Sequence, residues 1–267
     1  MDSDLKVKTM PRISKSPSNA DTQPAPGGAA AVDRALSLLA AFKSGDSALG
    51  LAELAERTGL YKSTVLRLLA SLEHAGLIQK INDGPSRGSY ALGMEVARLS
   101  GIYRSSFSLE RIVMPVLREL VGQTGESAAY HVLQRQWTEV KRLCLYRVDS
   151  PNPVRDHIQA GDFLPVDKGA GARILMAFSE SLVSSRVPLT SKDRRLFAQI
   201  REQGYFASVG DRLAEVGGIS APVFKRNANG ESEIAASLTL TMPTHRFVER
   251  HVRYVLEAAR RLTGLIQ

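Results

Sequence analysis

Hydrophobic positions recur with helical spacing in three successive segments near the start of the chain. The three apolar stripes are formed by Val32, Ala35, Leu36, Leu39 and Phe42, by Leu51, Leu54 and Ala55, and by Val65, Leu68, Leu69 and Leu72. Spacings of three, four and seven residues place each set on one face of a helix. Gly59 and Gly76 end the second and third helices, because glycine adopts positive φ at low cost. The pattern therefore predicts three helices, the third over about 62–75.

A short hairpin is predicted directly after the third helix. Residues 77–81 form an apolar run, and residues 82–88 are rich in Asn, Asp, Gly, Pro and Ser. Such residues form turns between strands, and residues 89–92 can return as the second strand. The N-terminal part is thus a three-helix unit followed by a β-hairpin.

The spacing of apolar residues changes after residue 127. Strands are expected at 129–134, 140–148, 154–160, 219–224 and 234–241, and helices at 170–180, 191–203 and 245–265. Interleaved strands and helices indicate one α/β domain. Residues 93–121 are helical in pattern, and Pro115 is expected to break that helix or to open a new one.

These patterns divide the chain into four parts. We expect a disordered tail over 1–30, a domain of three helices and a hairpin over 31–93, a helical linker over 94–120 and an α/β domain over 121–267. The tail is assigned from its Ser, Pro, Thr and Gly content, which cannot form a core. The fold class is therefore α+β with two domains.

Composition narrows the classes of protein that the 267 residues can form. Hydrophobic residues make up 43% and charged residues 23%, as in globular proteins. The lone cysteine, Cys144, excludes an intramolecular disulfide and a multi-cysteine zinc site. No apolar run has the length of a membrane span, and the polar N-terminus lacks a signal sequence. We therefore expect a soluble, cytoplasmic protein.

The net charge of +8 is compatible with a nucleic-acid partner, but its distribution weakens that argument. Residues 31–95 carry 7 basic and 7 acidic side chains, whereas residues 96–267 carry 24 and 17. A DNA-binding element near the N-terminus must therefore rely on a few well-placed cations. The excess in the second domain is compatible with an acidic effector, although a solvated surface explains it better.

Residues 51–69 match the requirements of a helix-turn-helix. Ala55 is small where two helices cross, Gly59 turns the chain, and apolar side chains fix the interhelical angle. The outward face of the second helix carries Lys62, Ser63, Thr64 and Arg67. In this motif the start of the second helix enters the major groove, where Arg can bind guanine and Lys a phosphate. The alternative is an ordinary helical hairpin with a solvated polar face.

The hairpin then has the position of a wing, with Arg87 at its tip. A basic residue at a wing tip is suited to the minor groove. A solvated turn residue is an equal alternative for Arg87 taken by itself.

The segment from Ala31 to Leu92 resembles the winged helix-turn-helix of IclR-type transcriptional regulators. The matching residues are 32–39, 51–60, 62–65, 67–69, 72–73, 76–77 and 90–93. Tyr61 departs from the family's usual proline, and either residue can open the helix. The resemblance continues more weakly to the C-terminus, through residues 115–120, 124–126, 147–151, 204–205 and 219–224. It implies a GAF-like effector domain behind the winged domain, and operator binding as a dimer or tetramer.

A candidate effector site begins at Ala170 and Gly171, where small residues at a helix start would let an anion reach free backbone N–H groups. By resemblance, Ser208, Gly218, Thr239 and Thr241 complete the pocket. Thr239 and Thr241 are two residues apart and face the same side of a strand. Close packing of the helix start and simple filling of a strand are the alternatives.

The sequence departs from the family around this site. Asp167 and Lys168 stand where the family has His and a small residue, Arg173 replaces Lys, and Gly218 offers no side chain. The effector of a relative therefore cannot be transferred to this chain.

The sequence motifs give little support for an enzyme. The five histidines, His74, His131, His157, His245 and His251, show no metal-ligand spacing. Cys144 lies between leucines in a predicted strand, as an apolar filler does. No G-x-S-x-G, P-loop or dinucleotide motif is present. We expect no metal and no cofactor.

The sequence thus predicts a non-enzymatic regulator whose operator binding is modulated by a small molecule, with a small organic acid as the favoured effector. Effector binding would shift the population toward one spacing of the two recognition helices in a dimer. The alternative is a ligand-binding or assembly module whose helix-turn-helix contacts protein.

Overall fold

The computed structural model describes residues 25–106, 109–136, 139–179 and 189–266. The chain forms two compact units, and the boundary between them follows Ala97. Most of the predicted tail, residues 1–24, lies outside the described residues, and the first helix begins at Ala30. Each unit is described by itself below.

The N-terminal unit consists of three helices and a hairpin, as predicted. The helices are α2 (Ala30–Ala40), α3 (Leu51–Thr58) and α4 (Lys62–His74). The antiparallel hairpin pairs β1 (Ile78–Lys80) with β2 (Tyr90–Leu92). Leu38, Leu54, Val65, Leu69 and Tyr90 are buried together in one core. Gly59 ends α3 with φ of 72°, which confirms the reason for a glycine there.

Two helices follow the hairpin, α5 (Met94–Ser106) and α6 (Leu109–Thr124). Pro115 lies inside α6, so the prediction that it breaks or opens a helix is wrong. At the seventh position of the helix this proline removes the N–H that would bond to the Arg111 carbonyl oxygen, and the burial of the α6 face in the core offsets that loss. Val113, Leu117 and Leu120 of α6 belong to the core of the C-terminal unit.

The C-terminal unit is built on a six-stranded antiparallel sheet in the order β5-β4-β3-β8-β7-β6. The strands are β3 (Ser127–Gln136), β4 (Glu139–Val148), β5 (Phe163–Leu164), β6 (Phe206–Val209), β7 (Val216–Arg226) and β8 (Ser232–Pro243). The predicted fold class, helix-turn-helix plus α/β domain, is confirmed.

Two sequence predictions for this sheet need correction. Residues 154–160 form no strand, and the short edge strand β5 follows them instead. Asp156 in this segment forms a buried ion pair with Arg147 instead of pairing with a neighbouring strand. The edge strand β6 was not predicted, because four residues carry too little periodicity.

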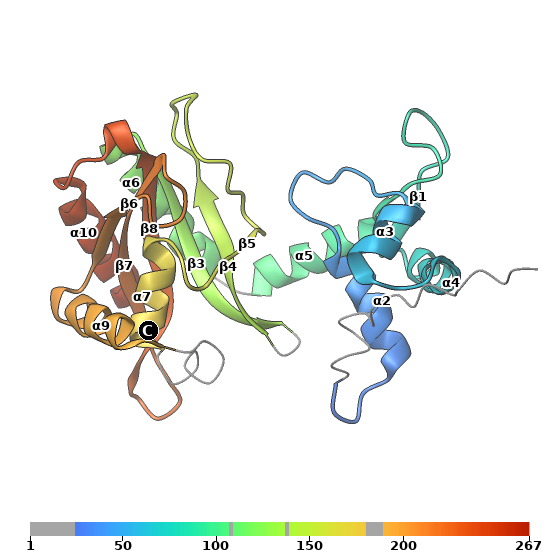
Figure 1. Cartoon of the computed structure of the whole chain (residues 1–267), viewed down its shortest axis with the longest axis horizontal. Coiled ribbons are helices and arrows are strands. Elements are labelled where there is room, and N and C mark those ends of the chain that lie inside the picture. The colour runs from blue at the N-terminus through green and yellow to red at the C-terminus, as the bar shows by residue number, and fades with distance from the viewer. Residues whose placement is uncertain (1–24, 107–108, 137–138, 180–188, 267) are drawn as a thin grey trace, which may run out of the picture. The chain divides into compact units, whose positions relative to one another are not determined.

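Helices cover both faces of the sheet (Figure 1). On one face lie α6 and α10 (His251–Leu265), and on the other lies α7 (Ala170–Phe178), backed by α9 (Ser191–Gln203). The predicted helix 245–265 is divided into a short 3-10 turn, Thr244–Arg246, and α10. None of the helices in the described ranges is long and apolar enough to cross a membrane.

Candidate nucleic-acid interface and ligand pocket

The start of α4 presents a polar surface to solvent. Lys62, Ser63 and Arg67 are exposed, and Thr64 is half-buried. Within the described part of the chain, none of these four side chains makes a hydrogen bond or an ion pair. Their donors are therefore available to an external partner. The first turn of α4 holds no acidic residue that would repel a phosphate.

The neighbouring cation Arg57 has a different role. It binds the Asp46 and Glu53 carboxylates and donates to the Ala41 carbonyl oxygen at 2.9 Å. These bonds tie α3 to the loop that follows α2. Charge alone therefore does not identify the nucleic-acid interface, because Arg57 supports the scaffold whereas Arg67 does not.

Arg87 lies exposed in the loop between β1 and β2. Gly88 N–H donates to the Ile81 carbonyl oxygen at 2.8 Å, so the hairpin remains paired up to that loop. The position agrees with a wing tip and does not by itself show a contact with DNA.

The C-terminal unit contains a pocket between the start of α7 and the sheet. All six residues predicted for the effector site line it, namely Ala170, Gly171, Ser208, Gly218, Thr239 and Thr241. They come from α7, β6, β7 and β8, and the fold brings them together. The cavity that it encloses is about 20 Å³, which is room for about one water molecule.

Gly171 allows the polar groups to approach the helix. A Cβ atom at this position would lie 2.7 Å from Thr239 Oγ1, 2.9 Å from Arg142 Nη1 and 3.1 Å from Ser237 Oγ. These three side chains therefore converge where any other residue would place a methyl group. The small residue at the helix start thus has a structural reason, which the sequence alone could not give.

Arg142 is the pocket residue that sequence reasoning missed and that matters most. It is 2% exposed, and Nη2 donates to the Lys168 carbonyl oxygen at 3.3 Å. Among the described residues it forms no ion pair, and its Nε has no partner. Burial, reinforced by Arg212, lowers the pKa of Arg142 to about 10.

The other charges at the pocket are neutralised within the protein. Asp211 accepts from Gly169 N–H at 2.6 Å and from Arg173 Nη2 at 3.0 Å. Arg212 contacts Asp156 at 3.5 Å. Asp211 and Asp167 act on Arg142 only through space, so its guanidinium has no direct ion-pair partner among the described residues.

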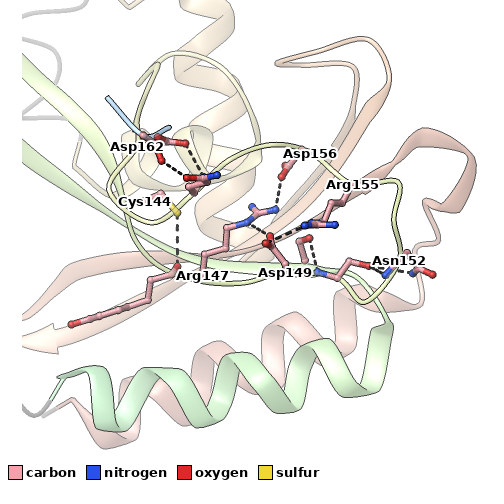
Figure 2. A network of polar contacts seen from close by, with 12 residues as sticks. Cys144, Arg147, Asp149, Asn152, Arg155, Asp156 and Asp162 are labelled. Carbon is pink, nitrogen blue, oxygen red and sulfur yellow. Dashed lines mark hydrogen bonds and ion pairs between the residues drawn. The ribbon is translucent and has the colours of Figure 1, made fainter. Parts of the chain in front are cut away.

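Asp156 connects this pocket to a network on the neighbouring loop. Figure 2 shows Arg147 pointing from β4 toward Asp156, with Asp149 and Arg155 beside it. Both members of the Arg147–Asp156 pair are nearly inaccessible, at 3% and 2% exposure of their side chains. Buried pairs of this kind hold their geometry, because breaking one leaves a lone charge.

His131 also faces the pocket and was missed. It is 1% exposed, its Nδ1 lies 3.2 Å from Thr239 Oγ1, and its Nε2 has no partner. Burial lowers the pKa of His131 well below its usual value, and Arg142 and Arg147 reinforce the shift. The ring is therefore neutral at physiological pH.

A β-bulge interrupts the alternation along β4, the strand that carries Arg142. Tyr130 pairs with Tyr146, whereas the next residue, His131, pairs with Cys144. The extra residue on β4 reverses which side chains face α7. A signal was nevertheless present, because Arg142 and His131 are polar residues inside otherwise apolar strands.

No feature of the described residues supports catalysis or a metal site. No cluster of three or more His, Cys, Asp or Glu could hold a metal ion in those ranges. Cys144 is fully buried, as expected for an apolar filler, and burial raises the pKa of its thiol to about 12. Its Sγ donates to the Tyr146 carbonyl oxygen at 3.9 Å, and Figure 2 draws this contact as a dashed line from the Cys144 sulfur.

Comparison with known proteins covers nearly the whole described chain. Residues 31–81 match the IclR helix-turn-helix domain, and residues 102–266 match the family described as bacterial transcriptional regulator IclR C-terminal. The chain is 25% identical to the transcriptional repressor IclR of Escherichia coli over 258 residues, which is 91% of this chain and 92% of that protein. It is 24% identical to the Pca operon regulatory protein of Acinetobacter baylyi, with 89% of each chain covered.

Solved structures show the same fold. A putative IclR transcriptional regulator from Silicibacter has a TM-score of 0.72 and 27% identity, covering 88% of this chain and 96% of that one. An IclR homologue from Microbacterium hydrocarbonoxydans, complexed with 4-hydroxybenzoate, has a TM-score of 0.71 and 23% identity, covering 88% and 98%.

Proposed function

The chain belongs to the IclR family of DNA-binding transcriptional regulators, which are not enzymes, and from that premise we propose that a small organic acid is its effector and that α4 reads its operator. The helix-turn-helix binds DNA and the C-terminal domain is an effector domain. The identity of the effector and the residues at each interface are the proposal.

Arg142, which is buried and has no direct ion-pair partner among the described residues, carries the proposal of an acidic effector. A buried cation without an ionic partner is costly, and a bound carboxylate would remove that cost. The N-terminus of α7 adds a positive dipole on the same pocket wall. The relative complexed with 4-hydroxybenzoate supports the class, because that ligand is also an organic acid.

For the operator we assign roles along α4 and the wing. Lys62 contacts a phosphate, Ser63 and Thr64 contact phosphate or base edges, and Arg67 binds a guanine in the major groove. Arg87 at the wing reaches the minor groove. The exposure of Lys62, Ser63 and Arg67, with no competing bonds among the described residues, supports these roles.

The regulator acts as a dimer or tetramer on a pseudo-palindromic operator. Val32 and Leu36, one turn apart on α2, are 55% and 47% exposed, which supports contact with another protein surface. Effector binding favours one spacing of the recognition helices, and the operator fixes the half-site spacing. A coupling free energy of about 1–3 kcal/mol would change operator affinity by about 5- to 150-fold.

A footprinting experiment tests this proposal. The purified protein selects fragments from its source genome, and the bound fragments are footprinted at two salt concentrations. We expect a palindromic footprint and a steep loss of affinity with salt, because bound cations release counterions. A helix-turn-helix that contacts protein through apolar groups would show neither.

Two variants on α4 separate the roles of its cations. Arg67→Ala should relax the preference at one operator position by about 1–3 kcal/mol. Lys62→Ala is the matched control, since loss of a phosphate contact weakens all sequences equally and lowers the salt slope by about 1. An unchanged sequence preference in Arg67→Ala would refute base reading by that residue.

A further inference from the structure

A chain of hydrogen bonds ends at the ligand pocket and determines what the pocket can accept. Ser220 Oγ donates to the Leu238 carbonyl oxygen at 3.0 Å, and it also lies 3.0 Å from Thr239 Oγ1. A carbonyl oxygen only accepts, so the single hydroxyl proton of Ser220 is used there. In the contact between Ser220 and Thr239, the donor is therefore Thr239.

The assignment of protons along these hydrogen bonds extends to His131. The hydroxyl proton of Thr239 is used toward Ser220, so Thr239 Oγ1 accepts from His131 Nδ1–H across their 3.2 Å contact. A neutral imidazole carries one proton, and here it sits on Nδ1. Nε2 therefore bears a lone pair, is buried, and has no donor among the described residues.

The pocket thus displays two unsatisfied groups of opposite kind. Arg142 offers N–H donors and a positive charge, and the hydroxyl of Thr241 is a further unpaired group beside the pocket. His131 Nε2 offers an acceptor that requires an N–H or O–H donor. A ligand that satisfies both must carry a carboxylate and, separately, a donor.

The lining also limits the size and shape of the ligand. No Phe, Tyr or Trp lines the pocket among the described residues, and Ile158 and Val216 are its larger apolar side chains. The enclosed cavity of about 20 Å³ has room for about one water molecule, so the pocket favours a ligand of few non-hydrogen atoms over a substituted ring. An amine donor is disfavoured because it would place a second cation beside Arg142 and Arg212.

We propose that the effector is a short aliphatic hydroxy acid whose carboxylate binds Arg142 and whose hydroxyl donates to Nε2 of His131. This inference rests on the proposed function, in which a small organic acid occupies the same pocket. It adds the identity of the second functional group of the ligand, a hydroxyl that His131 recognises. Arg142 selects the charge, and His131 selects a hydroxyl over a keto oxygen or a hydrogen atom.

A series of matched probes tests the inference on the full-length wild-type protein. Lactate, glycerate and 3-hydroxybutyrate are the hydroxy acids, propionate and butyrate lack the hydroxyl, pyruvate carries a keto oxygen, and glycerol lacks the carboxylate. Binding is measured by calorimetry. We expect at least one hydroxy acid to bind about tenfold or more tightly than its deoxy analogue, because the analogue leaves Nε2 unpaired. Pyruvate should bind more weakly than lactate, since its keto oxygen faces another acceptor.

The outcomes distinguish the two levels of the argument. Pyruvate or propionate binding as tightly as the hydroxy acids would overturn the role of His131 and leave an organic-acid effector intact. Tight binding of 4-hydroxybenzoate instead would overturn the aliphatic class. Binding of glycerol with no binding of any acid would overturn the proposed function itself.

Variants locate the binding in the pocket. Arg142→Met should abolish binding of the hydroxy acid, whereas Lys141→Met removes the same charge from the adjacent, half-buried position on β4 and should leave binding unchanged. His131→Leu should reduce the preference for the hydroxy acid over its deoxy analogue to about onefold. Retention of the preference in a folded His131→Leu protein would assign the hydroxyl to another group and overturn the proposal.

Discussion

Both faces of the six-stranded sheet are buried, but one carries apolar side chains and the other carries polar ones. Leu238 and Thr239 are neighbours on β8 and are 0% and 2% exposed. Leu238 packs with Tyr130 and Leu240 beneath α6 and α10, whereas Thr239 lies with Ser220 and His131 beneath α7. Burial therefore does not distinguish the faces, and the chemistry of the buried groups does.

The strands carry their unsatisfied polar atoms on one face, whereas on the other face α10 leaves Nδ1 of His251 without a partner among the described residues. Among the described strand residues, the buried side-chain atoms without a partner belong to His131, Arg142, Arg147, Ser237 and Thr241, all on the α7 side. Each such atom costs about 1–3 kcal/mol. A face that retains several of them lowers the stability of the free protein, and a ligand can recover part of that loss.

The largest effect is expected on the apolar face. Leu238→Ala should lower the free energy of unfolding by about 2–5 kcal/mol, because a fully buried side chain leaves a cavity in the core. Urea denaturation of the free protein measures it. A loss below about 1 kcal/mol would mean that the two faces do not differ in packing as described.

The opposite sign is expected at Arg142. Arg142→Met replaces a buried, unpaired cation by an apolar side chain of similar length, and the free protein should gain about 1–3 kcal/mol. The exchange Lys141→Met on the same strand is the control, and its effect should stay within about 0.5 kcal/mol. A destabilised Arg142→Met protein would show that the guanidinium serves the fold rather than the ligand.

Acid should act on the α7 face through His131. Its folded-state pKa lies below the unfolded value, so the unfolded chain takes up the proton first as the pH falls. Stability is therefore full above about pH 6.5 and decreases below it, by at most about 1.4 kcal/mol per pH unit for one group. Burial and Arg250 also lower the pKa of His251 on α10, so part of the decrease belongs to that residue.

Comparison with His131→Gln isolates the contribution of the pocket. The variant cannot titrate at this position, and its stability should fall less steeply between pH 6.5 and 5 than that of the unchanged protein. Denaturation curves at several pH values measure both slopes. Identical slopes would assign the whole acid sensitivity to other groups, His251 among them.

The sequence indicated the exposed polar face of α4 and part of the pocket lining. The α4 surface depends on spacing within one helix, so Lys62 and Arg67 could be placed from periodicity alone. Thr239 and Thr241 were expected at the pocket from the family resemblance, and alternation along one strand added that they face the same side. Arg142 could not be placed because β4 contains a bulge, and neither Arg142 nor His131 could be assigned to the pocket without the strand order that joins distant segments.

The smallest effect on stability is expected at Thr241, and it tests whether the polar face is kept for binding. Its Oγ1 is inaccessible and has no hydrogen-bond partner among the described residues. Thr241→Val keeps the shape of the side chain and replaces the hydroxyl by a methyl group. Removing an unsatisfied polar atom should leave the free energy of unfolding within about 0.5 kcal/mol, or raise it slightly.

The effector response should change in Thr241→Val although the fold does not. The double variant Thr239→Val with Thr241→Val should lose the response while retaining operator binding without effector. Thr239 forms hydrogen bonds with Ser220 and His131. The double variant should therefore also lose some folding stability, which the single Thr241→Val variant should not. Footprints with and without the hydroxy acid measure the response, and a fall in effector-free operator binding would make these hydroxyls structural.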